Sequence, residues 1–195
     1  MLTMKNLFAR ALLALMLVSG AGAALAGPTY RVTIDTAGYA GTGVIDFLLS
    51  GFEPSTDATA FVSNFTGDYL GASDFSGEAS GSIGTGVVLG TRDGFSTFTQ
   101  TLNLGRSFGF DLRFDFGPVS EGAGFSVGLF SDTLDTYLGE FGTLVAIDMT
   151  PGQPDLVFVD SALVDVSEVP EPATLASLVL GLALMGSILR ARRMG

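Results

Sequence analysis

The sequence predicts an all-β domain, an antiparallel β-sandwich of the jelly-roll kind, flanked by an N-terminal signal helix and a C-terminal transmembrane helix. Three observations lead to this prediction. Apolar and polar residues alternate with a period of two along the middle of the chain, as they do in strands with one buried face. Glycine-rich turns recur there about every 8 to 12 residues. Long uncharged apolar runs occur only near the two ends.

The segment Ser107–Phe116 shows the alternation most clearly, because phenylalanine or leucine occupies every second position. Asp111, Arg113 and Asp115 fall between them, so one face is apolar and the other charged. The same pattern predicts further strands at Tyr30–Ile34, Phe95–Leu104, Phe125–Leu129, Leu144–Met149 and Leu156–Val166. We expect the phenylalanines of such strands to form core, since sugar-stacking surfaces favour Trp and Tyr and the chain has no Trp.

Two stretches rich in small residues, Gly38–Gly43 and Gly77–Gly90, are predicted to provide turns, bulges and close sheet packing. Gly84-Thr85-Gly86 and Gly122-Ala123-Gly124 are also predicted as turns, because neither completes a Gly-x-Gly-x-x-Gly pattern followed by a helix. Residues 27–166 are therefore predicted to form one β-sandwich domain, which the chain length also favours.

Residues 1–26 have the organisation of a secretory signal peptide. A basic start with Lys5 and Arg10 is followed by the apolar run Ala11–Val18, which is too short to span a bilayer. Ala24 and Ala26 are the small residues that signal peptidase requires before its cleavage site. The sequence therefore predicts export and cleavage after Ala26, with an uncleaved anchor as the alternative.

The other end of the chain is predicted to hold a membrane anchor. Residues 167–172 form an extended spacer, because each proline biases the residue before it away from helix. Residues 173–189 form a transmembrane helix, since the 18 residues from Pro172 to Leu189 carry no charge and would rise about 27 Å as a helix. Residues 190–195 form a basic tail, in which Arg190, Arg192 and Arg193 keep the C-terminus cytoplasmic and the domain outside. A buried core helix is the alternative, but it would have to accommodate apolar residues on every face.

The exported part is strongly acidic. Between Gly27 and Glu168, four basic residues stand against nineteen acidic ones, a net charge of −15, and none of the basic residues is lysine. Such a surface repels nucleic acids and polyanionic glycans. Neutral polymers and divalent cations remain as possible partners.

The composition also restricts catalysis. The chain has no histidine and no cysteine, which excludes disulfides, thiol catalysis, Ser-His-Asp triads and the usual zinc sites. We expect no cofactor and no enzymatic activity, although carboxylate pairs leave a glycosidase as a remote alternative. Asp132 and Asp135 are weak calcium candidates, since no complete calcium-binding loop surrounds them. Asn64-Phe65-Thr66 matches a glycosylation acceptor pattern, but we interpret it as part of a strand.

The last 27 or so residues resemble a PEP-CTERM sorting signal. Pro170, Glu171 and Pro172 form the triplet, an apolar segment containing Gly181 and Gly186 follows, and the arginines close the chain. The order and spacing of these parts behind a signal peptide make the resemblance specific. The middle domain is also similar, more faintly, to Phe- and Gly-rich β-sandwiches of PEP-CTERM proteins, which brings no established activity.

The resemblance implies a function in sorting. Such proteins are exported by Gram-negative, exopolysaccharide-producing bacteria and recognised near the triplet by an exosortase, a membrane cysteine transpeptidase. The expected partners are thus the exosortase, signal peptidase and secretion machinery, the inner membrane and an exopolysaccharide, and no nucleic acid. The expected location is the inner membrane facing the periplasm, then the cell surface or the extracellular matrix. A carbohydrate-binding module for a neutral exopolysaccharide is the alternative function.

Overall fold

The computed structural model describes residues 27–54, 56–117, 121–139, 142–159, 162–169 and 181. Residues Pro28–Val169 form one compact unit built entirely of strands and their connections. The predicted signal helix (1–26) and transmembrane helix (173–189) lie outside the described residues, Gly181 excepted, and stay predictions. Among the described residues, no helix has the length and apolarity needed to cross a membrane.

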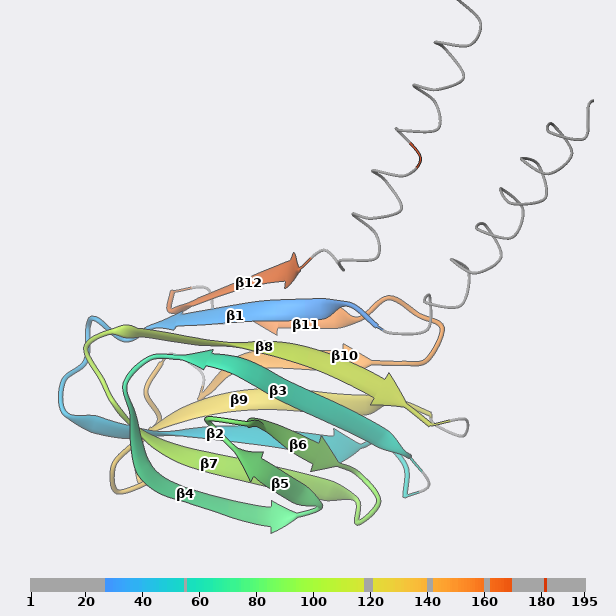
Figure 1. Ribbon diagram of the computed structural model, residues 1–195, viewed down its shortest axis with the longest axis horizontal. Coiled ribbons are helices and arrows are strands. Elements are labelled where there is room, and N and C mark those ends of the chain that lie inside the picture. Colours follow the sequence, from blue (N-terminus) through green and yellow to red (C-terminus); the bar gives the residue numbers. More distant parts are fainter. Residues whose placement is uncertain are drawn as a thin grey trace, which may run out of the picture. The chain divides into compact units, whose positions relative to one another are not determined.

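The strands form two antiparallel sheets, which Figure 1 shows as two layers. Sheet A has the order β12-β1-β8-β3-β6-β5, and sheet B the order β11-β10-β9-β2-β7-β4. The bounds in sheet A are β1 Thr29–Asp35, β3 Ala58–Thr66, β5 Ala79–Ser82, β6 Gly86–Gly90, β8 Ser107–Phe116 and β12 Val164–Val169. Those in sheet B are β2 Thr42–Gly51, β4 Tyr69–Gly77, β7 Phe95–Asn103, β9 Ala123–Ser131, β10 Thr143–Met149 and β11 Leu156–Val159. The prediction of an all-β fold with two antiparallel sheets is confirmed.

The first eight strands pair in a nested way. β1 pairs with β8, β2 with β7 and β3 with β6, so each pair encloses the next along the chain. The two innermost strands, β4 and β5, follow each other directly but lie in different sheets. β9 and β10 then extend sheet B beyond β2, and β12 extends sheet A beyond β1.

The core lies between the sheets and is rich in phenylalanine. The ring of Phe47 in β2 contacts Phe98 of the same sheet and Phe110 of the opposite one, with centroids 5.8 and 5.0 Å away. Phe125 and Phe65 complete the shell around it at 6.4 and 6.1 Å. A fully buried side chain of this size contributes about 1.5–3 kcal/mol to folding, and edge-to-face pairs add to it. Packing of rings from both sheets therefore stabilises a domain that contains no disulfide.

The predicted strands are found where the alternation was strongest. The range Leu156–Val166, predicted as one strand, instead contains β11 of sheet B and the beginning of β12 of sheet A. In β8, Phe108, Phe110, Leu112 and Phe114 are buried as expected, and every second residue of β1 and β9 also points into the core. In β7 the buried face runs through Ser96, Phe98, Gln100 and Leu102, so Phe95 is exposed.

Four strands were not predicted at all, β2, β4, β5 and β6, and of β3 only Asn64–Thr66 was expected in a strand. The stretch Gly77–Gly90, expected to provide turns and close packing, contains both β5 and β6 in addition to a turn at Gly84. Close packing does occur at Gly90, where an added Cβ would lie within 3 Å of the Glu78 carboxylate. The prediction of a turn at Gly122–Gly124 is wrong in part, because Ala123 and Gly124 already belong to β9.

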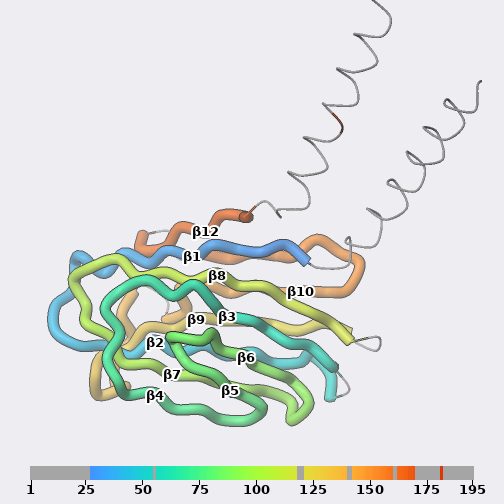
Figure 2. The backbone as a smooth tube through the Cα atoms, in the orientation of Figure 1, coloured from blue at the N-terminus to red at the C-terminus, as the bar shows by residue number. Residues whose placement is uncertain are grey.

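The domain also extends further than expected. Ser167, Glu168 and Val169, which we expected in the spacer, are the last residues of β12 and pair with β1. Val169 lies opposite Thr29, so the first and last strands of the domain begin and end side by side (Figure 2).

Candidate functional site

The predicted sorting and processing residues lie outside the described part of the chain. They are Ala24, Ala26, Pro170, Glu171, Pro172, Arg190, Arg192 and Arg193. What the structure does describe is the residue directly before the triplet, Val169, at the end of an edge strand of sheet A. Ser167, Glu168 and Val169 are all exposed there. The last described residues before the triplet are therefore accessible on the surface of a complete domain.

The calcium candidates lie in the loop after β9, and the structure gives Asp135 another role. Its Oδ1 accepts hydrogen bonds from the hydroxyls of Thr133 (2.7 Å), Ser131 (2.8 Å) and Thr136 (3.1 Å). These bonds lower the pKa of Asp135, that from Thr133 most. They also hold a tight loop in which Leu134 has a left-handed backbone, with φ of 61°. In the described residues, no third acidic side chain joins Asp132 and Asp135 to complete a metal site.

The outward face of sheet A is covered by an internal polar network. Arg31 donates to Asp111 Oδ1, to the carbonyl of Asn64 and to the Thr66 hydroxyl, each at 3.0 Å. The Asn64 amide donates to the second oxygen of Asp111 at 2.7 Å. Asn64-Phe65-Thr66 is thus part of strand β3, as predicted. The Asn64 side chain is engaged in the hydrogen bond to Asp111. Arg113 lies 4.4 Å above the ring of Phe61, with Asp115 beside its guanidinium group.

The outward face of sheet B, which we call the open face, has a different chemistry. None of the six strands of this sheet contains a basic residue. Across β4, β7, β2 and β9 the register aligns Asp74, Thr99, Asp46 and Gly128 in one row. The next row is Ser76, Thr97, Leu48, Ser126, Ala146 and Phe158. The open face therefore presents hydroxyls, small residues and carboxylates, with the large apolar side chains of Leu48 and Phe158 among them.

Asp46 is the unusual group on the open face. It is half-buried between Thr99 and Gly128, and this burial raises its pKa. Removing a carboxylate from water without a cationic partner disfavours its charged form. Sequence reasoning missed this residue because an isolated Asp in an apolar strand gives no motif. The signal was the interruption of Val44-Ile45-Asp46-Phe47-Leu48 by one charge.

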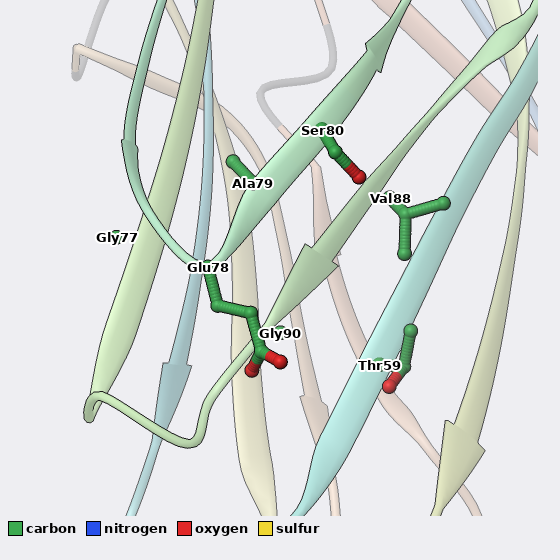
Figure 3. A pocket seen from close by; sticks show the side chains of 7 residues that line it. All are labelled: Thr59, Gly77, Glu78, Ala79, Ser80, Val88 and Gly90. Atoms are coloured by element: carbon green, nitrogen blue, oxygen red, sulfur yellow. The ribbon is translucent and has the colours of Figure 1, made fainter.

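A small pocket lies against β5 and β6, at one edge of sheet A. It has a volume of about 230 Å³, and Glu78, Ser80, Val88 and Thr59 line it with three small residues (Figure 3). Glu78 reaches across Gly90 and lies 3.7 Å from Arg92, which also approaches Asp57 at 3.8 Å. The Glu78 carboxylate therefore faces the guanidinium group of Arg92, beside the edge strands β5 and β6 of sheet A.

Of the four tyrosines, all of which the structure describes, only Tyr137 is strongly exposed. Its ring lies against that of Phe130, tilted by 38°, with the centroids 4.6 Å apart. Tyr69 instead packs edge-on against Phe65 and Phe108, and burial raises its pKa.

Comparison with known proteins adds no relative, since no family model, no curated protein and no solved structure matches the chain.

Proposed function

We propose that this is an exported cell-envelope or extracellular-matrix protein without catalysis of its own, sorted through a C-terminal PEP-CTERM signal by an exosortase. The observation that supports the proposal most is the position of the last strand, which ends directly before the triplet. The described domain is complete at Val169, and the triplet begins at the next residue. A cut at or after Pro170 would thus remove no strand and expose no core.

The chemistry around this boundary supports recognition by a membrane enzyme. Two prolines lack backbone N–H groups and hold a segment extended, so Pro170 and Pro172 would prevent β12 from continuing as a ladder. Glu171 supplies the one charge between the strand and the apolar segment 173–189. The arginines behind that segment would stop translocation and fix the depth of the triplet.

The finer features of the fold belong to the same proposal. We infer a jelly-roll-like sandwich, supported by the nested pairs β1–β8, β2–β7 and β3–β6, because winding a long hairpin generates this pattern. A cleaved signal helix at 1–26 and a transmembrane helix at 173–189 flank it. The route then runs from the inner membrane, with the domain in the periplasm, to the cell surface or beyond.

The test follows the size and location of the protein in cells with and without the exosortase, using an antibody against the domain. We expect a shorter, surface-associated or released form only when the exosortase is present, and loss of that form in Glu171→Ala. Glu168→Ala is the matched control, because it removes the neighbouring exposed acid but leaves the triplet intact. Equal size and location in all strains and variants would refute sorting.

The open face favours one second function, binding of a neutral exopolysaccharide. Its rows of Thr and Ser hydroxyls and carboxylates offer hydrogen bonds to sugar hydroxyls, and its strands contain no cation to attract an acidic polymer. Glycan-array binding that Thr99→Val weakens, and that Thr33→Val on the outward face of sheet A does not, would support this function. Hydrolysis of a bound glycan that Asp46→Asn abolishes would instead indicate a glycosidase.

A further inference from the structure

The domain has an end at which the chain both enters and leaves it. Thr29, the first residue of β1, lies opposite Val169, the last residue of β12. The adjoining end of sheet B is fixed by the hydrogen bond from Tyr30 Oη to Asp155 Oδ2, 2.7 Å long, directly before Leu156. We call this the exit end of the sandwich.

Large apolar side chains are exposed at the exit end. The end row of sheet B runs through Phe95, Ser50, Gly124, Asp148 and Leu156. The side chains of Phe95 and Leu156 are 50% and 59% exposed, and Phe52, directly after β2, is 50% exposed. Phe158 in the next row and Val169 in sheet A add exposures of 56% and 38%. We call these five residues the exit rim: Phe52, Phe95, Leu156, Phe158 and Val169. Phe95, Leu156 and Phe158 project from the outward face of sheet B, and Val169 from the outward face of sheet A.

The segments that carry the exit rim are held in place by buried hydrogen bonds. The Thr91 hydroxyl donates to the carbonyl of Thr56 at 2.7 Å and accepts from the amide of Ala58 at 2.9 Å. The backbone of Phe52 donates to Gly122 at 3.1 Å, and its ring lies against this glycine, where a Cβ would be 2.8 Å from Cδ2. These bonds fix the part of the rim that Phe52 and Phe95 form, where large apolar side chains stay in contact with solvent.

The length of chain after Val169 indicates what covers this surface. Only Pro170, Glu171 and Pro172 separate Val169 from the apolar segment 173–189, and three extended residues span at most about 10 Å. Before any cleavage, an anchored domain would thus be held with Val169, at its exit end, within about 10 Å of the bilayer. We propose that the exit rim rests on the outer surface of the membrane while the protein is anchored, an inference that rests on the proposed membrane anchor.

The surrounding charges specify the lipid. Acidic residues outnumber basic ones on the connections at the exit end, which carry Glu53, Asp93, Glu121 and Asp155. The basic residue there is Arg92, which lies near the carboxylates of Asp57 and Glu78. The acidic residues would be repelled by anionic headgroups, so the rim is suited to zwitterionic lipid, with apolar side chains entering between the headgroups. Contact should weaken when anionic lipid is added at low salt and return when salt screens the repulsion.

The absence of native cysteine from the sequence allows a direct experiment. The full chain, purified from membranes and reconstituted in phosphatidylcholine vesicles, would carry one cysteine labelled with an environment-sensitive fluorophore. Phe95→Cys and Leu156→Cys report on the rim from two strands. Leu134→Cys is the matched control, because Leu134 is 56% exposed on the loop at the opposite end of β9. Unchanged thermal unfolding would show that each variant is folded.

We expect blue-shifted emission and at least twofold quenching by spin-labelled lipid at positions 95 and 156, and neither effect at position 134. Protein that floats with vesicles while all three positions stay equally water-exposed would overturn the rim proposal and leave the anchor intact. Protein that does not float would instead refute the anchor. Shielding at position 156 without lipid quenching, together with disulfide dimers of the unlabelled Leu156→Cys variant, would overturn lipid contact in favour of a second copy of the chain.

Discussion

The two outward faces of the sandwich differ in whether their charged residues have partners of opposite charge. On sheet A, Arg31 and Arg113 are each engaged by carboxylates and further partners of the same face. On sheet B, Asp46 and Asp74 stand in a row of Thr and Gly with no basic residue in any of its strands. A face whose charged groups bond to one another serves stability, whereas a face whose strands offer its carboxylates no basic partner keeps polar groups available for binding. We therefore assign stability to sheet A's face and any ligand binding to the open face.

The largest expected loss of stability concerns the core that both sheets share. Phe47→Ala removes a ring that joins the two sheets and should cost about 3–5 kcal/mol of the free energy of unfolding, measured with urea. Leu48→Ala, the next residue of the same strand but on the open face, should cost less than half as much. Equal losses would contradict the assignment of the core to the Phe47 side of β2.

The next effect is confined to sheet A. Arg31→Met leaves Asp111 with a single amide partner and should cost about 1–2 kcal/mol in urea unfolding, since hydrogen bonds to charged groups exceed neutral ones. Arg106→Met, at an exposed arginine, should cost less than about 0.5 kcal/mol. If the two variants were equally stable, the network on sheet A would be only a surface arrangement.

The smallest effect should have the opposite sign and appear on sheet B. Burial raises the pKa of Asp46 above its usual 3.8, so its neutral form favours the folded state and that advantage is lost as the pH rises through the folded pKa. Asp46→Asn should therefore be more stable than the native protein at pH 7, by up to about 1 kcal/mol after allowance for solvent screening. Below pH 3 the two should coincide. A variant less stable at pH 7 would indicate that the carboxylate has a stabilising partner.

The sequence predicted the strands whose alternation is strict and missed those whose alternation is interrupted. In β8 every second residue is large and apolar, which is sufficient to define the strand. In β3 and β4, glycine, serine and alanine replace large residues, and a shift of register between Ser63 and Thr66 breaks the period. The candidate sites divide in the same way. The sorting triplet is a contiguous motif, whereas the open face arises from residues that only the sheet register aligns.

The most direct test of the central claim is the mass of the mature protein recovered from the cell surface or medium. Our account predicts a chain that begins at Gly27 and ends near the Pro-Glu-Pro triplet, without residues 173–195, in cells that contain the exosortase. Recovery of a folded, surface-located protein that still carries Arg190, Arg192 and Arg193 would contradict it.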